Sequence, residues 1–276
     1  MRVESGQVAV VTGGARGLGR GLAGELVRRG ASVVLADLQE EAVRETAREL
    51  AGEGAEVESA VVDVADPDAM HALARRVLDR FGRLDFAVNN AGVVPTGAKP
   101  MWEADLQEWR RTVDVNLFGV LHGVRAFVPH LVEAGRGHVI NVASLAGLAG
   151  TPLTASYGAT KHAVVALSEM LEAELAMKGL PIGVSVVCPG FVRTSMTEGM
   201  QDASAMQEWA EQMGTSGSEL ISMIEETARD MLEPDEAARR ILEAVESGAL
   251  HVLPSGDVAD GAWNRARRVL DALESE

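Results

Sequence analysis

Short apolar runs alternate with longer amphipathic stretches through the first two thirds of the chain. Continuous apolar runs of this length are typical of strands that are buried on both faces, as in a parallel sheet covered by helices. The predicted strands are Val8–Val11, Ser32–Ala36, Val57–Val62, Leu84–Val88, His138–Val142 and Ile182–Val187.

Between these runs, apolar residues recur at the three- and four-residue spacing of helices that pack one face on a core. Gly30 behind the first stretch and Asp66-Pro67 at the start of the third are signals for helix ends. The predicted helices are Leu18–Arg29, Glu40–Gly52, Pro67–Phe81, Leu106–Val128 and Ser156–Lys178. This alternation predicts an α/β fold, a Rossmann-type doubly wound parallel sheet in three α/β/α layers.

The regular pattern ends after Cys188. Residues Met196–Glu233 contain nine acidic side chains, one basic side chain and six of the eleven methionines. Beyond them the pattern predicts a helix from Pro234 to about Gly248, a short strand His251–Leu253 and an amphipathic helix around Trp263–Leu273. No linker of Ser and Gly interrupts the chain, so residues 1–276 are interpreted as a single domain.

Composition narrows the classes of function. The chain has 276 residues, 47% of them hydrophobic, and a net charge of −16, which repels phosphate backbones and argues against general nucleic-acid binding. The single Cys188 cannot form an internal disulfide, and neither a secretory signal nor an apolar run of membrane-spanning length is present. We therefore expect a cytoplasmic protein with no membrane partner. The six histidines show no metal-ligand spacing, so no metal is expected.

A glycine-rich turn joins the first strand to the first helix. The sequence Thr12-Gly13-Gly14-Ala15-Arg16-Gly17-Leu18-Gly19 has the spacing G-x-x-x-G-x-G. Glycines let a backbone turn tightly against a pyrophosphate, whose charge then lies at the start of a helix. Asp37 ends the second strand, where a carboxylate accepts hydrogen bonds from ribose hydroxyls and repels a 2′-phosphate. The alternative is a plain glycine-rich loop and a helix-capping Asp.

Tyr157, the only tyrosine, stands four residues before Lys161, one of only three lysines. Residues i and i+4 share one helix face, so both side chains can point into one cleft. An ammonium nearby stabilises tyrosinate and lowers the tyrosine pKa, which makes Tyr157 a candidate general acid and base. The alternative is a half-buried tyrosine beside a surface lysine.

Two polar residues complete the candidate site. Ser144 follows the fifth strand, at the edge where α/β sheets bind ligands, although a serine there is often a turn or cap residue. Asn116 is a polar residue in the apolar run Val113–Val120, where a locally satisfied core amide is the alternative.

Together these motifs resemble the short-chain dehydrogenase/reductase family over roughly residues 7–194. The residues that carry the resemblance appear in family order: Thr12–Gly19, Asp63, Asn89-Asn90-Ala91-Gly92, Asn116, Ser144, Tyr157-Gly158-Ala159-Thr160-Lys161 and Pro189-Gly190. The resemblance implies that Tyr157 is the acid and base, that Ser144 orients the carbonyl, and that Asn116 helps to hold a relay water. It also implies that Lys161 binds the nicotinamide ribose and lowers the pKa of Tyr157.

The resemblance further implies a dinucleotide held along the whole sheet edge. The implied cofactor-binding residues are Gly13, Arg16, Gly17, Leu18, Gly19, Asp37, Asp63, Val64, Asn90, Ala91, Gly92, Tyr157, Lys161, Pro189, Gly190, Val192 and Thr194. Asp37 stands where NAD-preferring members carry an acid, whereas Arg16 stands where many NADP-users carry a base. Because like charges repel directly at a 2′-phosphate, we expect NAD, with NADP less favoured.

By the same resemblance, Met196–Glu233 is a helical substrate lid after the sixth strand. Its methionines suit an apolar ligand and its charge of −8 disfavours phosphorylated or CoA-linked substrates, unless the methionines simply pack on the core. A homodimer through Leu106–Val128 and Ser156–Lys178, or a homotetramer, is expected, although the C-terminus lacks the family's usual tail.

The predicted function is an NAD-dependent oxidoreductase acting on a neutral, fairly apolar secondary alcohol or ketone. Three alternatives stay open. They are an NADP-preferring carbonyl reductase, an epimerase or dehydratase that uses bound NAD, and a non-catalytic dinucleotide-sensing protein.

Overall fold

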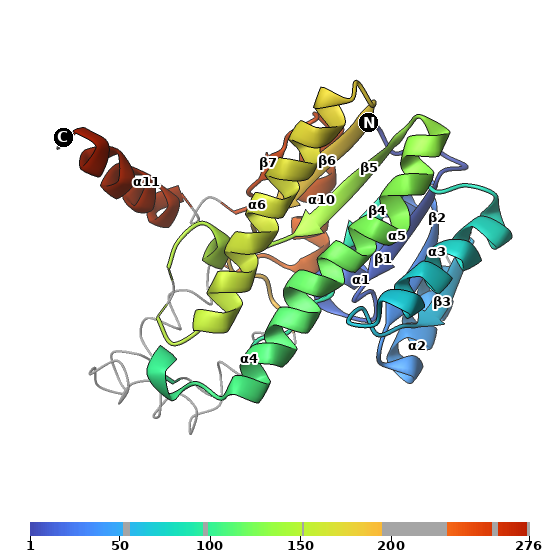
Figure 1. Ribbon diagram of the computed structural model, residues 1–276. Helices are drawn as coiled ribbons and strands as arrows, with labels where there is room; N and C mark the ends of the chain where they lie inside the picture. The colour runs from blue at the N-terminus through green and yellow to red at the C-terminus, as the bar shows by residue number, and fades with distance from the viewer. Residues whose placement is uncertain (52–55, 96–98, 151, 195–230, 256–258, 275–276) are drawn as a thin grey trace.

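The structure, a computed structural model, describes residues 1–51, 56–95, 99–150, 152–194, 231–255 and 259–274. Its parallel strands form one sheet in the order β3-β2-β1-β4-β5-β6-β7 (Figure 1). The strands are β1 Val8–Thr12, β2 Ser32–Asp37, β3 Val57–Val61, β4 Phe86–Asn89, β5 Gly137–Val142, β6 Ile182–Val187 and β7 His251–Val252. The chain runs outward from β1 to β3, returns, and runs outward from β4 to β7, which confirms the doubly wound topology.

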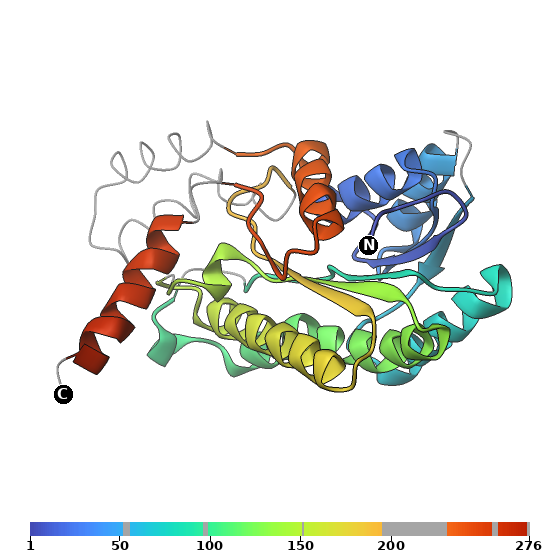
Figure 2. The same ribbon diagram turned by 90° about the horizontal axis from the view of Figure 1, so that it is seen from above.

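Helices cover both faces of the sheet. Apolar side chains of α1, α2 and α10 pack with one face, and those of α3, α5 and α6 pack with the other (Figure 2). The helices are α1 Gly17–Arg28, α2 Glu40–Ala51, α3 Pro67–Phe81, α4 Leu106–Val113, α5 Gly119–Ala134, α6 Ala155–Met177, α10 Pro234–Glu246 and α11 Ala259–Glu274. The three-layer prediction is therefore confirmed.

The predicted helix Leu106–Val128 is wrong in two respects. A single π-helical segment, Asp114–Phe118, interrupts it between α4 and α5. Helix α5 also continues through Pro129 to Ala134 and ends at Gly135, whose φ of 65° is left-handed. Proline usually ends a helix, but Pro129 is exposed while Leu131, one half-turn later, is buried, so the packing of the last turn outweighs the lost hydrogen bond.

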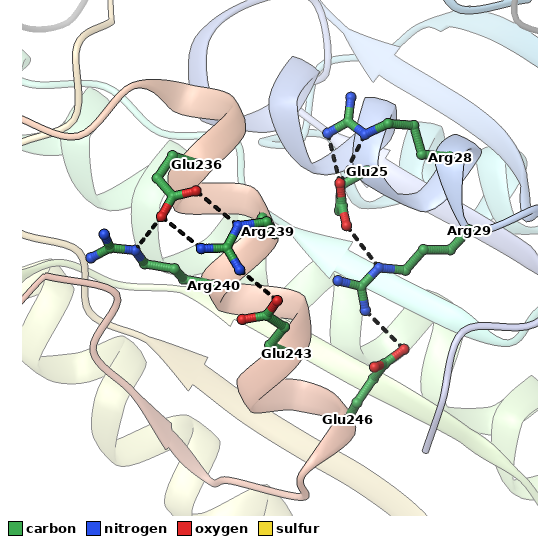
Figure 3. A network of polar contacts seen from close by, with 8 residues as sticks. All are labelled: Glu25, Arg28, Arg29, Glu236, Arg239, Arg240, Glu243 and Glu246. Atoms are coloured by element: carbon green, nitrogen blue, oxygen red, sulfur yellow. Dashed lines mark hydrogen bonds and ion pairs between the residues drawn. The ribbon is translucent and has the colours of Figure 1, made fainter.

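The pair of helices beside the glycine-rich turn is bound by ion pairs. Arg29, just after α1, contacts Glu25 of α1 and Glu246 of α10 at 2.8 Å each (Figure 3). The two helices also approach closely, because a Cβ on Gly21 would lie 2.7 Å from the carbonyl oxygen of Pro234. Helix α10, which follows the region of the predicted lid, thus packs directly on the helix that begins at the glycine-rich turn.

Among the residues that the structure describes, one stretch of helix is long and apolar enough to cross a membrane by length and composition. It is Leu106–Ala134, with a mean hydropathy of 1.3 in its most apolar window, and 44% of that window is buried in the fold. Phe127 and Leu131 of this stretch are fully buried against the sheet. We therefore interpret it as a core helix.

The C-terminus differs in extent from its prediction. Strand β7 has two residues, ends before Leu253 and pairs with β6 at the edge of the sheet. The last helix, predicted around Trp263–Leu273, spans Ala259–Glu274 and extends away from the body of the protein (Figure 1).

Candidate active site

The glycine-rich turn has the backbone that its sequence predicts. Gly13 and Gly17 have φ values of 63° and 52°, in the left-handed region that favours glycine. A Cβ on Gly19 would lie 2.1 Å from the carbonyl oxygen of Gly13, so no side chain fits there. Arg16 occupies the N-cap of α1, and its side chain does not cap the helix. The first amides of α1, including that of Leu18, are thus arranged to bind an anion.

Asn90 fixes this turn to the end of β4. Its Nδ2 donates to the carbonyl oxygens of Thr12 and Gly13 at 2.9 and 3.1 Å. In return the Thr12 hydroxyl accepts from the backbone amides of Asn90 and Ala91. The side chain of Asn90 is therefore engaged by the protein, so we assign it to shaping the turn.

Asp37 lies at the carboxyl end of β2 beside the same turn. Its carboxylate accepts from the backbone amides of Ala15 at 3.1 Å and Gln39 at 3.0 Å. Arg16 is exposed at the entrance of the turn. The carboxylate of Asp37 therefore lies at the end of β2, whereas Arg16, the residue type that favours NADP, is exposed to solvent.

The end of β3 contributes Asp63 and Val64. Asp63 is exposed and accepts from the amide of Ala65 in a local turn. Val64 is buried, and a Cβ on Gly119 at the start of α5 would lie 2.8 Å from its side chain. Both residues lie along the same carboxyl edge as Asp37.

Tyr157 and Lys161 share one face of α6, as the spacing predicts. The Nζ atom of Lys161 lies 5.6 Å from the centroid of the Tyr157 ring. Lys161 is 3% exposed, and its Nζ donates to the carbonyl oxygen of Val142 at the end of β5, at 2.9 Å. The sheet edge thus fixes the lysine beneath the phenol.

Burial controls the ionisation of this pair. Desolvation lowers the pKa of Lys161 to about 8. Desolvation also raises the pKa of Tyr157, and a hydrogen bond with the Ser144 side chain opposes this only in part. Burial thus raises the net pKa of Tyr157, and the lowering of this pKa by the nearby Lys161 ammonium stays a prediction.

Ser144 faces the phenol from the end of β5. Its hydroxyl accepts from the amide of Ala146 at 3.2 Å and is hydrogen bonded to Tyr157. Beneath it, the buried thiol of Cys188 accepts from the backbone amide of Ser144, and desolvation raises the pKa of this thiol to about 12. Ser144, Tyr157 and Lys161 thus form one cluster at the carboxyl end of the sheet.

Asn116 lies in the π-helical segment and is fully buried. Its Oδ1 accepts from the amide of Val93 at 2.7 Å, and its Nδ2 donates to the carbonyl of Val93 at 2.8 Å. A Cβ on Gly92 would lie 3.4 Å from Asn116 Oδ1 and 3.5 Å from Lys161 Nζ, so the asparagine is next to the cluster. We assign Asn116 as a positioning residue, since its amide is already paired with Val93.

The segment after β6 closes the other side of the site. Pro189 accepts from the amide of Leu145, next to Ser144, at 2.8 Å. The amide of Gly190 donates to Ser255, and Val192 forms a parallel bridge with Leu232. A Cβ on Gly17 would lie 2.8 Å from the Thr194 side chain. Residues 189–194 and the glycine-rich turn therefore face one another.

The predicted lid Met196–Glu233 lies outside the described residues except for its last three positions. Within the described part of the chain, no group of three or more His, Cys, Asp or Glu residues could hold a metal ion.

Some contacts in the site could not be predicted from the sequence. The backbone of Val93 pairs with the Asn116 side chain, and the sulfur of Cys188 accepts from the Ser144 amide, but neither residue belongs to a recognisable motif. Leu153, between β5 and α6, adopts a φ of 64°, which is strained for a residue with a branched side chain and occurs near functional sites. A π-helical segment is also typical of functional sites, but sequence periodicity does not distinguish it from a helix.

Comparison with known proteins agrees with this geometry. Residues 7–205 match the family model described as short chain dehydrogenase. The chain belongs to the short-chain dehydrogenase family. It is 36% identical over 250 residues to the 1-deoxy-11-beta-hydroxypentalenate dehydrogenase of Streptomyces avermitilis, which covers 90% of this chain and 84% of that protein.

Solved structures of the same family bind different dinucleotides. A short-chain dehydrogenase/reductase from Burkholderia phymatum in complex with NAD superposes with a TM-score of 0.84 and 31% identity, over 98% of this chain and 96% of that chain. A metagenomic short-chain oxidoreductase in complex with NADP superposes with a TM-score of 0.71 and 33% identity, over 91% and 97%. The chain is thus an oxidoreductase of a family whose members use NAD or NADP.

Proposed function

We propose that this short-chain dehydrogenase transfers hydride between NAD and a neutral, fairly apolar secondary alcohol or its ketone. The observation that supports it best is the cluster of Ser144, Tyr157 and Lys161 across from the glycine-rich turn. The relative from Streptomyces avermitilis is named for dehydrogenating a hydroxyl-bearing compound, which supports alcohol oxidation.

The described residues fit a dinucleotide. The uncapped start of α1 and the positive φ values of Gly13 and Gly17 suit a pyrophosphate. Leu18, Gly19 and Ala91 shape the same turn. Asp63 and Val64 would lie along the adenine side, and Lys161 and Gly92 along the nicotinamide side. Pro189, Gly190, Val192 and Thr194 would close over the nicotinamide and the diphosphate.

In the proposed oxidation, NAD supplies an acceptor for the two electrons that leave the substrate carbon as hydride. The Tyr157 phenolate takes the proton of the substrate hydroxyl and becomes the phenol, while the alcohol becomes a ketone. Ser144 donates a hydrogen bond to the substrate oxygen and keeps it near the Tyr157 oxygen. Lys161, charged and buried beneath the ring, stabilises the phenolate before the proton is transferred. Asn116 holds the Val93 backbone that borders this cleft.

The preference for NAD rests on Asp37. Its carboxylate stands at the end of β2, where it would accept from ribose hydroxyls and repel a 2′-phosphate. Arg16 is exposed at the N-cap of α1, and we give the direct repulsion by Asp37 the greater weight.

The substrate class and the assembly rest on separate observations. The substrate class rests on the methionines and the −8 charge of Met196–Glu233, which are features of the sequence. We propose a homo-oligomer through the outer faces of α5 and α6, where Phe118, next to α5, and Met170 of α6 are 43% and 65% exposed. A cytoplasmic location stays a prediction from the single, buried Cys188.

A panel of secondary alcohols with NAD and NADP tests the proposal. We expect net NADH formation, with apolar neutral alcohols ahead of sugar phosphates and acyl-CoA. An epimerase or dehydratase would convert substrate without net NADH, and a sensing protein would bind the dinucleotide without turnover. Higher catalytic efficiency with NADP would identify a carbonyl reductase and reject the role given to Asp37.

A further inference from the structure

Helix α11 presents an exposed apolar face. Trp263, Val269, Leu270 and Leu273, here termed the α11 stripe, are 70%, 54%, 56% and 69% exposed. At 3.6 residues per turn these four side chains fall within one side of the helix. A solvent-exposed stripe of this kind indicates a binding surface.

Arginines border the α11 stripe. With about 100° between successive residues, Arg267 lies about 40° from Trp263 on one edge, and Arg265 lies about 40° from Val269 on the other. Both arginines are exposed. The stripe therefore fits a surface that is apolar at its centre and acidic around it.

Such a surface is present on the same chain. Met101 and Trp102 lie in a short 3-10 helix, Met101–Glu103, just before α4, and Leu106 is the first residue of α4; they are 64%, 84% and 68% exposed, and the acidic Glu103 and Asp105 between them are exposed too. These five residues are termed the Met101 patch. Helix α11 and the start of α4 lie apart at the same end of the molecule in Figure 1. The high exposure of both surfaces shows that they do not cover each other within one chain.

Both surfaces lie close to the candidate active site. A Cβ on Gly261, in the first turn of α11, would lie 3.0 Å from Ala149 and 3.9 Å from Leu145, the residue after Ser144. Helix α4 leads directly into the π-helical segment that holds Asn116. A partner that joined the two surfaces would therefore border the cleft.

We propose that the α11 stripe of one copy docks on the Met101 patch of a second copy, and that the two copies exchange these contacts about a two-fold axis. Opposite charges meet in this arrangement, with Arg265 and Arg267 facing Glu103 and Asp105. Because the chain has a net charge of −16, the rest of a second copy also attracts Arg265 and Arg267. The same negative charge is repelled by an anionic membrane, so a membrane is disfavoured as the partner of the α11 stripe.

The available area reaches the lower limit of a specific contact. A 16-residue helix is about 24 Å long and about 10 Å wide, so one side of it presents about 240 Å². Two exchanged helices and the two patches they cover then bury about 1,000 Å², the lower limit of specific interfaces. This interface is separate from the outer faces of α5 and α6, so the two together would build a tetramer.

Disulfide capture between two variants tests the proposal directly. Leu270→Cys and Leu106→Cys are prepared in the full-length protein, mixed and oxidised; the natural Cys188 is buried and stays. We expect a cross-link between the two different variants. Absence of this cross-link, or a cross-link of Leu270→Cys with itself, would overturn the proposal. A third variant that carries both substitutions in one chain should link only between chains, and a link within one chain would also overturn it. Val61→Cys, 50% exposed at the far edge of the sheet, is the matched control and should not link to Leu270→Cys.

Sedimentation measures the same contact without cysteines. Leu270→Asp should weaken association at least about tenfold, as expected for the loss of an apolar anchor, whereas Val61→Asp should not. Arg267→Glu should weaken it too, and mixing with Glu103→Arg should restore part of the loss. If Leu270→Asp leaves the mass unchanged over the whole concentration range, the α11 stripe does not hold a second copy.

Discussion

A buried histidine should make this protein sensitive to mild acid. His138, at the start of β5, is 2% exposed and stacks on Phe86. Its Nε2 lies 2.9 Å from the Ser185 hydroxyl, which itself donates to the carbonyl of Ala249. Nε2 must therefore carry the hydrogen, and Nδ1 is left bare, with no partner among the described residues. Protonation would put a new N–H at Nδ1, in the core and without an acceptor.

The size of the effect follows from linkage. Desolvation, with a smaller contribution from the charge of the N-terminus, lowers the pKa of His138 from an ordinary 6.5 to about 4. The unfolded chain binds the proton more readily, so the contribution of neutral His138 to stability is complete above pH 6.5 and is lost as the pH falls towards 4. Between pH 7 and pH 5 this amounts to about 2 kcal/mol.

Urea unfolding at pH 7 and pH 5 measures this difference in the free energy of unfolding. His138→Gln keeps a donor for Ser185 but does not titrate, so we expect its loss of stability between the two pH values to be about 2 kcal/mol smaller than that of the parent protein. His71→Gln, on partly exposed α3, controls for removing a histidine elsewhere. If His138→Gln and the parent lose the same stability, His138 does not carry the effect.

Three further predictions concern the site and its supports. Replacing Asp37 by Ser should raise the ratio of kcat/KM for NADP over NAD at least about tenfold, and an unchanged ratio would show that Asp37 does not select the cofactor. Gly123→Ala should lower stability by about 2 kcal/mol in thermal unfolding because its Cβ would lie 1.9 Å from Asn89 Oδ1, whereas Gly150→Ala, with nothing within 4 Å, should not. Because burial raises the pKa of Tyr157, the rate of alcohol oxidation should keep rising with pH beyond the ordinary tyrosine value; a plateau at neutral pH would contradict this assignment.

The sheet and most helices could be predicted because their signals are local. Apolar runs identified all seven strands to within two residues at either end, and Asp66-Pro67 marked the exact start of α3. The exception is the stretch Leu106–Val128, since neither a π-helical segment nor a proline tolerated on an exposed face alters the apolar periodicity. These features depend on what the helix packs against.

The sequence predicted which residues of the candidate site lie together, but it did not predict the direction of the Tyr157 pKa shift. The four-residue spacing of Tyr157 and Lys161 placed them on one face, and the glycine spacing gave the turn its backbone. The sign of the Tyr157 pKa shift could not be read from the sequence, because it depends on how far burial of the ring outweighs the hydrogen bond with Ser144. Likewise, the pairing of Asn116 with Val93 involves a backbone that no side-chain pattern reveals.

The most direct test of the central claim is the rate of NADH formation by Tyr157→Phe with a secondary alcohol that the parent protein oxidises. The Tyr157 phenolate is the proposed proton acceptor, so removal of its oxygen should lower kcat by about 10²-fold or more. Dinucleotide affinity, measured by titration, should change little, because the glycine-rich turn and Asp37 are untouched. A variant that binds NAD normally and still turns over within a few-fold of the parent would contradict the account.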